Sequence, residues 1–168
     1  MSEDLYAGVV GQARAVAQLR SAVRAPVHAY LLVGPPGTGK LTAARGFAAS
    51  LLCPSGGDGT CDVCRRVLGH VHPDVMVLER EGASILVEDA REISRISARS
   101  PVEGDRKVIV LTEFHLVDKA GPALLKTIEE PPPSTVFVIL AEHVPAELVT
   151  IASRCCRIDF GPIPTDQL

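Results

Sequence analysis

The sequence predicts a single α/β domain in which helices cover both faces of a parallel β-sheet. Apolar runs such as VIVL and VFVIL show no polar alternation, which is typical of strands buried on both faces. Segments with helical spacing of apolar residues alternate with these runs along the chain, as in proteins with a parallel sheet. With 168 residues, of which 46% are hydrophobic, the chain has enough apolar material for the core of one domain.

The first third of the chain predicts a helix, a strand, a glycine-rich loop and a second helix. Between 9 and 24 the apolar residues recur at near-helical spacing, so a short amphipathic helix is expected after Gly11. The apolar run 28–33 predicts a strand that stops at Gly34. The alanine-rich segment 40–52 contains no proline and predicts a helix, and the segment 54–60 (PSGGDGT) predicts a loop.

The rest of the chain continues the alternation. Strands are expected at 74–78, 107–111, 135–140 and 157–160, and helices at 87–99 and 118–130. The last helix is expected to end at the triple proline 131–133, because proline cannot continue a helix. We therefore expect one domain at 1–162 with a cysteine-rich insertion at 53–64, and the start of a linker at 163–168, where the prolines of GPIP begin.

The bulk properties exclude several classes of protein. The formal net charge of −3 and the pI of about 5.9 argue against a free-standing DNA-binding module, which normally carries a strong basic excess. The N-terminus begins acidic without the apolar core of a signal peptide, and no run of roughly 18 apolar residues occurs. We expect a soluble cytoplasmic protein without membrane contact. Its five cysteines are expected to be metal ligands or buried thiols rather than disulfides.

A phosphate-binding loop is predicted between the first strand and the second helix. The segment GPPGTGK matches the first seven positions of the Walker A pattern and has the strand and helix neighbours that the pattern requires. Its backbone N–H groups can wrap phosphates at a helix N-terminus, and its lysine can reach the outer phosphates. The alternative is a relic loop that holds no nucleotide. The candidate residues for binding ATP or ADP are Gly34, Pro35, Pro36, Gly37, Thr38, Gly39, Lys40, Leu41 and Thr42.

Both positions that should bind Mg²⁺ are altered. The residue after Lys40 should be Ser or Thr, whose hydroxyl holds the metal ion, but it is Leu41. Thr42 lies one helical residue further and is expected to point about a quarter-turn away. The strand VIVL should end in Asp-Glu but is followed by Thr112 and Glu113, which leaves Glu113 as the catalytic candidate of a degenerate Walker B motif. We expect poor Mg²⁺ binding and weak or absent ATP hydrolysis.

Four blocks of the sequence resemble one family, the bacterial clamp-loader AAA+ subunits of DNA polymerase III, gamma/tau and delta-prime. The blocks are Val10-Gly11-Gln12, HAYLLVGPPGTGK at 28–40, ALLKTIEEPPPSTVFVIL at 123–140 and Ser153-Arg154-Cys155. The third block is the most specific, because a helix ending in LLK-x-x-EEPP before an apolar strand is not expected in an unrelated P-loop protein. The resemblance covers nearly the whole chain. It implies an AAA+ domain followed by lid and collar domains, and it adds Val10 to the nucleotide-binding candidates.

The resemblance also implies a role for one arginine. In this family the Ser-Arg-Cys motif supplies an arginine finger to the ATP of a neighbouring subunit, so Arg154 is expected to act in trans. The alternative for Arg154 is a buried ion pair with a carboxylate of its own domain. Family ATPases often place a Thr, Ser or Asn sensor where this chain has Ala141, Glu142 and His143. Together with the altered Mg²⁺ positions, this departure favours the delta-prime branch, whose members tend to act as rigid stators.

The function that the resemblance implies is assistance in loading the sliding clamp onto primed DNA during replication, as a component of the DNA polymerase III holoenzyme. The expected partners are gamma/tau and delta subunits, with the sliding clamp and primed DNA reached through the assembly. One alternative is an ATP-hydrolysing motor of the gamma/tau type, in which Thr42 or a water network rescues the Mg²⁺ site. Another is a stand-alone regulator that binds zinc and nucleotide.

A group of three cysteines follows the helix 40–52 with the spacing C-x7-C-x2-C. The cysteines are Cys53, Cys61 and Cys64. Clamp-loader subunits often carry a four-cysteine zinc module at this point, so the resemblance implies Zn²⁺. The missing position is held by Asp58, whose carboxylate can bind zinc and which is the expected fourth ligand. His70 and His72 are alternative ligands, and a reduced loop without metal is the alternative to a zinc site.

A basic stripe is predicted on the helix 87–99, where arginines recur every four residues. The candidates for contact with DNA phosphates are Arg91, Arg95 and Arg99. In clamp loaders the helices of this region line a chamber that follows the DNA backbone, so these arginines could add to a shared surface. The alternative is an ordinary solvated face, in which Glu88 and Glu92 pair with the arginines three residues later.

Overall fold

The computed structural model describes residues 3–80, 82–117 and 120–167 and contains the predicted parallel sheet. The strands are β1 (Ala29–Val33), β2 (Val75–Leu78), β3 (Lys107–Leu111), β4 (Thr135–Ala141) and β5 (Cys156–Asp159). They form one sheet in the order β2-β3-β4-β1-β5, and every neighbouring pair is parallel. The strand that leads into the glycine loop, β1, therefore lies between β4 and β5.

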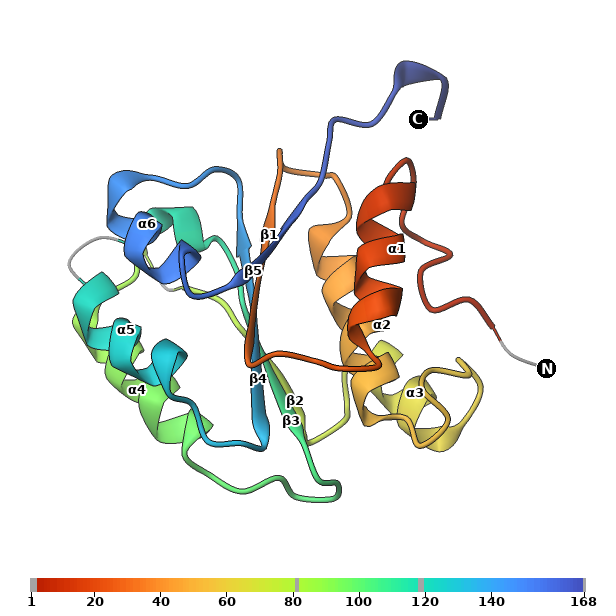
Figure 1. The fold of residues 1–168 in the computed structure, drawn as a ribbon, viewed down its shortest axis with the longest axis horizontal. Coiled ribbons are helices and arrows are strands. Elements are labelled where there is room, and N and C mark those ends of the chain that lie inside the picture. Colours follow the sequence, from red (N-terminus) through yellow and green to blue (C-terminus); the bar gives the residue numbers. More distant parts are fainter. Residues whose placement is uncertain (1–2, 81, 118–119, 168) are drawn as a thin grey trace.

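Helices cover both faces of the sheet, as the unbroken apolar strands predict. The helices are α1 (Ala13–Ala22), α2 (Lys40–Leu52), α3 (Asp62–Leu68), α4 (Val87–Ser97), α5 (Gly121–Glu129) and α6 (Ala146–Ala152), with 3-10 turns η1 (Phe114–Leu116) and η2 (Thr165–Gln167). Helices α1, α2 and α3 lie on one side of the sheet and α4, α5 and α6 on the other (Figure 1). The predicted α/β sandwich is confirmed.

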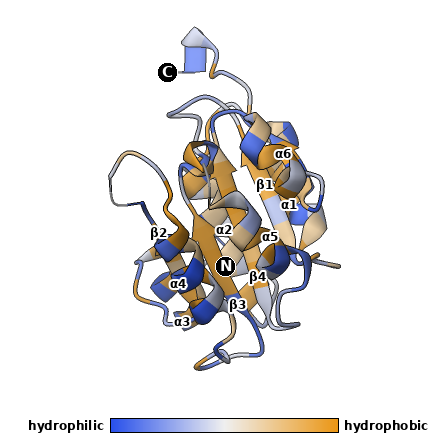
Figure 2. Ribbon diagram, turned by 90° about the vertical axis from the view of Figure 1, so that its left-hand side faces the viewer, coloured by the Kyte–Doolittle hydropathy of each residue, from blue (hydrophilic) through white to orange (hydrophobic). Residues whose placement is uncertain are grey.

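Each strand contributes alternate side chains to the two layers, because successive side chains point to opposite faces. In β1, Tyr30 and Leu32 pack with the layer of α1 and α2, whereas Leu31 packs with the opposite layer. The Tyr30 ring meets Phe47 of α2 edge-on, with 4.9 Å between ring centroids. Figure 2 shows the resulting pattern, in which the strands are hydrophobic and polar residues gather on the outer faces of the helices.

The parallel register brings the carboxyl ends of three strands together, which is where α/β proteins bind ligands. Val33 at the end of β1 pairs with Ala141 at the end of β4, and Leu111 at the end of β3 pairs with Ile139. The glycine loop, the segment that begins at Thr112 and the residues after β4 therefore start from the same edge of the sheet.

Two helices, α3 and α6, were not predicted. Each has only seven residues, so neither offers the long apolar periodicity that identifies a helix in a sequence. The N-terminus of α3 is capped by the thiol of Cys61, which accepts the backbone N–H of Cys64 at 3.4 Å. Helix α6 begins directly after Pro145, and its buried Leu148 and Ile151 hold it against α5.

Other boundaries differ by a few residues. Helix α4 ends at Ser97 rather than at the predicted Arg99, because the ammonium of Lys107 takes up the carbonyl groups of Ile96 and Arg99 at the end of the helix. The predicted start of the next helix, at 118 and 119, lies outside the described residues, and α5 begins at Gly121. Strand β5 begins at Cys156 instead of the following residue.

A pair of hydrogen bonds joins the start of α1 to the segment after β5. Gln12 Nε2 donates to the carbonyl oxygen of Gly161 at 2.7 Å, and the Gly161 backbone N–H donates to Gln12 Oε1 at 3.0 Å. Gln12 is 6% exposed, so this amide is a structural clamp rather than a surface group. In the part of the chain that the structure describes, no helix combines the length and the apolar character that crossing a membrane requires.

Candidate functional site

The glycine loop has the backbone shape of a phosphate-binding loop. It follows β1 and leads into α2, whose first residue is Lys40. Gly37 and Gly39 adopt left-handed φ angles of 76° and 89°, which L-residues with a side chain rarely adopt. The first backbone N–H groups of α2 have no partner within the helix and lie at its positive dipole end, which favours a bound phosphate.

Gly34 has a second, structural reason to be glycine. A Cβ added to Gly34 would lie 2.4 Å from the carbonyl oxygen of Phe160 at the end of β5, whereas a Cβ added to Gly37 would meet open space. The Gly34 backbone N–H also donates to the carbonyl oxygen of Ala141 at 3.1 Å. Gly34 therefore permits close packing of the sheet, and Gly37 permits the turn of the loop.

The side chain of Lys40 is folded back onto the loop. Its Nζ atom donates to the carbonyl oxygens of Gly34 at 2.6 Å and Pro35 at 2.7 Å, and it lies 3.5 Å from Thr38 Oγ1. Burial lowers the pKa of this ammonium, and the charge of Glu142 partly opposes that shift. Lys40 would have to exchange some of these contacts with the loop to bind a phosphate.

A cavity of about 490 Å³ lies in front of the loop, a volume within the range of ligand sites. Its lining residues are Pro36, Gly37, Gly39, Lys40, Leu41, Thr42, Glu79, Thr112, Glu113, His115, Leu140, Ala141 and Glu142. The structure therefore brings six of the predicted loop residues together with the predicted Walker B segment, whereas Gly34, Pro35 and Thr38 do not line the cavity. Val10 is not among the lining residues. Its neighbour Val9 instead packs on the loop, with Cγ1 3.5 Å from a Cβ placed on Gly39.

The two positions that normally bind Mg²⁺ lack the usual oxygen ligands, because neither carries the hydroxyl or the carboxylate expected there. Leu41 presents a hydrocarbon side chain. The hydroxyl of Thr112 donates to the carbonyl oxygen of Leu78 at 3.2 Å, so it is engaged with the neighbouring strand. Thr42 is exposed, and its Cγ2 atom lies 3.4 Å from a Cβ placed on Gly8, beside the N-terminal segment. Weak binding of Mg²⁺ at this site stays a prediction.

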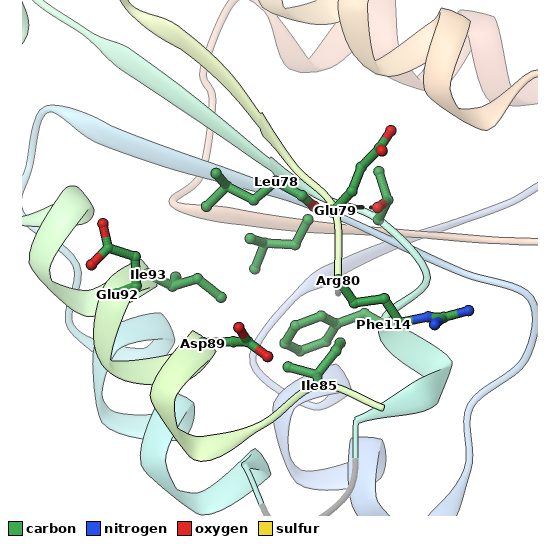
Figure 3. A pocket seen from close by; sticks show the side chains of 10 residues that line it. Leu78, Glu79, Arg80, Ile85, Asp89, Glu92, Ile93 and Phe114 are labelled. Atoms are coloured by element: carbon green, nitrogen blue, oxygen red, sulfur yellow. Dashed lines mark hydrogen bonds between the residues drawn. The ribbon is translucent and has the colours of Figure 1, made fainter. Parts of the chain in front are cut away.

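A smaller cavity of about 110 Å³ lies behind the Walker B segment, between the ends of β2 and β3 and helix α4 (Figure 3). It shares Glu79 and Thr112 with the larger cavity in front of the glycine loop, and Ile85, Ile93 and Phe114 supply apolar walls. The dashed line in Figure 3 is the hydrogen bond of Thr112 to Leu78. This cavity is too small for a nucleotide, and its apolar wall supports the strand ends from which the larger site is built.

Sequence reasoning missed His115, which lines the cavity in front of the glycine loop from η1. Its Nδ1 atom accepts the backbone N–H of Glu142 at 3.1 Å, and its Nε2 atom lies 3.8 Å from Glu142 Oε2. Burial lowers the pKa of His115, which keeps the imidazole neutral at pH 7. The available signal was its position two residues after Glu113, directly beyond the end of a predicted strand.

Arg154 lies in the corner between α6 and β5 and is partly exposed. Its Nε atom donates to Oε1 of Glu129, the last residue of α5, at 2.5 Å. Its Nη1 atom donates to Ser153 Oγ at 2.7 Å and to the carbonyl oxygen of Thr150 at 3.2 Å. The side chains of Arg154 and Glu129 are 42% and 34% exposed. The ion pair considered from the sequence exists, but it is not buried.

The cysteine group closes into a cluster that could hold a metal ion. One ligand atom from each of four residues lies within 4.8 Å of the others, and the residues are Cys53, Asp58, Cys61 and Cys64. The sulfur atoms of Cys53 and Cys61 are 3.7 Å apart. Zn–S bonds of about 2.3 Å in a tetrahedron separate two sulfur atoms by roughly 3.8 Å, so the spacing fits a bound zinc ion. The backbone N–H of Ser55 donates to Cys53 Sγ at 3.4 Å, which supports a thiolate.

Asp58 joins this cluster, and the two alternative histidines do not. Oδ1 of Asp58 accepts the backbone N–H groups of Thr60 and Cys61 at 2.9 Å each, and these bonds lower the pKa of Asp58 to about 2. The carboxylate is therefore ionised at neutral pH, as a metal ligand must be. His72 is turned elsewhere, since its Nδ1 atom accepts the backbone N–H of Asp74 at 3.0 Å. Within the described residues, no histidine belongs to the cluster.

The predicted basic stripe is only partly helical. Arg91 and Arg95 are exposed on α4, whereas Arg99 lies beyond the end of the helix. Arg95 forms an ion pair with Glu92, as the solvated-face alternative expects. Contact of these arginines with DNA stays a prediction.

Comparison with known proteins adds an independent observation. Residues 11–164 match the protein family described as "DNA polymerase III, delta subunit". The chain is 40% identical over 145 residues to DNA polymerase III subunit delta' of Pseudomonas aeruginosa. This match covers 82% of this chain and 44% of that protein. It is 36% identical over 167 residues to DNA polymerase III subunit gamma/tau of Mycobacterium tuberculosis, covering 95% of this chain and 29% of that protein. The chain thus spans less than half the length of these relatives.

A solved structure shows the same fold. A DNA polymerase III gamma subunit-related protein from Thermotoga maritima superimposes with a TM-score of 0.62 at 22% sequence identity, over 90% of this chain and 47% of that one.

Proposed function

The chain belongs to the DNA polymerase III delta-subunit family, and from this membership we propose that it acts in a clamp loader as a stator-like subunit of the delta-prime type. In this role it does not hydrolyse ATP itself. It presents Arg154 to ATP bound by a neighbouring subunit and helps the assembly to load a sliding clamp onto primed DNA. The expected partners are gamma/tau and delta subunits.

This proposal is carried by the contrast between altered Mg²⁺ positions at the cavity and an accessible arginine, Arg154, at the other end of the sheet. At the cavity in front of the glycine loop, Leu41 supplies no oxygen and Thr112 supplies no carboxylate, so a Mg²⁺ ion lacks its usual protein ligands. Without that ion the charge on the transferring phosphate is poorly neutralised, and hydrolysis suffers more than binding. At the corner after α6, Arg154 is accessible to a partner. An arginine finger needs no intact ATP site in its own subunit.

The lining of the cavity also bears on which ligand it holds. Glu79, Glu113 and Glu142 face the same cavity as a single lysine, Lys40. Three carboxylates repel the phosphates of a nucleotide that lacks a bound cation. We propose that the site binds ATP or ADP weakly. If the affinity is weak enough, the glycine loop is a relic that holds no nucleotide.

Zinc is the second cofactor that we propose. Cys53, Asp58, Cys61 and Cys64 fit Zn²⁺ in ligand number, ligand type and spacing. A zinc ion there would tie the end of α2 to the start of α3, so we assign it a structural role. The two sulfur atoms of Cys53 and Cys64 are buried, as in a closed structural site rather than an open catalytic one.

A motor of the gamma/tau type is the second candidate function. It is favoured by the 36% identity to a gamma/tau subunit and by the same three carboxylates, which could hold Mg²⁺ from unusual positions. Under this alternative the protein alone turns over ATP in a Mg²⁺-dependent reaction.

The test is ATP turnover by the full-length protein, alone and assembled with gamma/tau and delta subunits, with and without Mg²⁺. We expect no turnover by the protein alone. We expect the complex to turn over ATP faster with wild-type Arg154 than with Arg154→Ala. Mg²⁺-dependent turnover by the protein alone would establish the motor, and equal rates of the two complexes would remove the finger assignment.

A further inference from the structure

The guanidinium group of Arg154 is held on two of its three nitrogen atoms by its own domain. Nε donates to Glu129 Oε1 at 2.5 Å. Nη1, which has two N–H groups, donates to Ser153 Oγ and to the carbonyl oxygen of Thr150. These contacts come from two different helices, because Glu129 ends α5 whereas Thr150 lies in α6. The plane of the guanidinium is therefore set by the packing of α5 against α6.

The third nitrogen is left for an external ligand. Within the described residues Nη2 has no hydrogen-bond partner, and the side chain is 42% exposed. Nη2 carries two N–H donors, which suit the oxygen atoms of a phosphate. The ion pair to Glu129 thus orients the arginine without consuming the donors that a neighbouring subunit's nucleotide would need.

We propose that Glu129 is a positioning residue for the arginine finger: it holds Arg154 so that the Nη2 edge faces the phosphates of ATP bound by the neighbouring subunit. This inference rests on the proposed function of Arg154. The physical basis is preorganisation. A free arginine side chain has many rotamers, whereas a guanidinium that is already oriented loses less conformational entropy when it binds the transition state. A carboxylate that merely neutralised Arg154 would have the opposite effect, and its removal would strengthen the finger.

The two roles differ in their kinetic consequences. A finger acts on charge that develops in the transition state, so loss of its orientation lowers kcat and leaves the KM for ATP nearly unchanged. Glu129→Gln keeps the size of the side chain and removes its charge, whereas Glu129→Asp keeps the charge and shortens the side chain. Glu130 is the matched control, since it is the next residue, is exposed to solvent and has no contact with Arg154 among those that hold its guanidinium.

The experiment measures steady-state ATP hydrolysis by the full-length protein assembled with gamma/tau and delta subunits. We expect Glu129→Gln to lower kcat. The decrease in log kcat should be at least roughly half of the decrease that Arg154→Ala causes. Glu129→Asp should recover most of the activity, and Glu130→Gln should match wild type. In the Arg154→Ala background, Glu129→Gln should cause no further loss, because the two residues act as one unit.

The outcomes separate this inference from the function on which it rests. If Arg154→Ala lowers kcat while Glu129→Gln equals or exceeds wild type, the positioning role is wrong and the finger stands. If Arg154→Ala has no effect, the proposed function itself fails. An additional loss in the double variant would also overturn the positioning role, because it would mean a general structural defect. Assembly, followed by size-exclusion chromatography, and thermal melting of each variant identify such a defect directly.

Discussion

The carboxylate of Glu113 lies 3.1 Å from Nε of Arg80, which follows strand β2. Glu113 has a left-handed φ of 51°, a conformation that is uncommon outside glycine. The contact is an ion pair rather than a hydrogen bond, since the buried Nε–H of Arg80 points away from any acceptor in the described residues. The one acidic residue left in the Walker B segment is thus held by a cation of its own domain, which argues against its use as a water-orienting base.

Restoring both oxygen ligands should restore metal-dependent binding. We expect Leu41→Thr combined with Thr112→Asp to bind ATP at least roughly tenfold more tightly with Mg²⁺ than without it, because a hydroxyl and a carboxylate then meet the ion. Calorimetric titration with and without Mg²⁺ measures this. In the wild type and in the matched variant Leu41→Val, which adds no oxygen, Mg²⁺ should change the affinity little. An equally large Mg²⁺ effect in the wild type would contradict our interpretation of Leu41.

Zinc should raise the stability of the fold through the cysteine cluster. Zinc held at roughly 100 times its Kd adds on the order of 3 kcal/mol to the free energy of unfolding. We expect thermal melting of freshly reduced protein to show a zinc-dependent rise in Tm that is lost in Cys64→Ser and kept in the control Cys156→Ser, whose thiol is exposed on β5. Metal analysis should find about one equivalent of zinc. A Tm that does not respond to zinc would favour the metal-free loop.

Asp58 holds the loop through two backbone N–H groups and is also the proposed fourth zinc ligand, and one substitution can separate these two roles. Asp58→Asn keeps an oxygen that accepts the N–H groups of Thr60 and Cys61 but loses the charge that zinc requires. We expect Asp58→Asn to weaken zinc binding at least roughly tenfold, a loss comparable to that of an outer-shell partner. The Tm of the zinc-free protein should change little. Competition with a chromogenic chelator measures the affinity. Unchanged affinity would mean that Asp58 only shapes the loop.

Asp74 should stabilise the fold in a pH-dependent manner. Its buried carboxylate accepts the backbone N–H groups of Val102 at 2.5 Å, Glu103 at 2.9 Å and Gly104 at 3.1 Å. Burial raises the pKa of Asp74, but these N–H groups outweigh burial and bring it below the usual value of 3.8. The ionised form therefore stabilises the fold above pH 3.8, and the contribution is lost as the pH falls through the lowered pKa.

The corresponding variant is Asp74→Asn. We expect it to cost about 1–3 kcal/mol at pH 7 in urea unfolding, with the difference from wild type narrowing below the usual pKa of a carboxyl group. A constant difference down to acid pH would show that the charge of Asp74 does not contribute.

Two glycines of the loop should respond differently to alanine. Gly34→Ala places a Cβ 2.4 Å from a backbone oxygen of Phe160, so we expect a loss at or above the upper end of the 1–3 kcal/mol typical of overpacking. Gly37→Ala meets open space but keeps a φ of 76°, which costs about 1–2 kcal/mol. Equal losses in urea unfolding would contradict the close approach of Gly34 and Phe160.

The regular elements of this fold were largely predictable because their signals are local. Helix α2 and strand β3 have the predicted bounds, since an uninterrupted apolar or alanine-rich segment stands between clear breaks. The alternation of such segments was enough to predict the sandwich. Helices α3 and α6 escaped prediction because their stability comes from a thiol cap and from packing on α5, neither of which is visible in seven residues.

The features of the candidate sites were also predictable where they depend on adjacent residues and not where they depend on distant contacts. The glycine loop and the missing metal ligands follow from adjacent residues, and the cavity joins them because parallel strands end at one edge. The partner of Arg154 could not be predicted, because Glu129 is 25 residues away in the sequence. The sequence alone does not indicate which of several carboxylates forms an ion pair with a given arginine. His115 was missed for a similar reason, since only the fold brings it to Glu142.

The hydrogen-bonded clamp between Gln12 and Gly161 couples the segment after β5 to the start of α1. Two hydrogen bonds close a connection across 149 residues of sequence, so a pull on the backbone just beyond β5 reaches the start of α1 without passing through the sheet. Gly11, which precedes this amide, lies against the residues that follow Gly161, and Val9 rests on the glycine loop. The contacts from Gly161 to the glycine loop therefore run through only a few residues, so we expect a change that breaks the clamp between Gln12 and Gly161 to loosen the glycine loop as well.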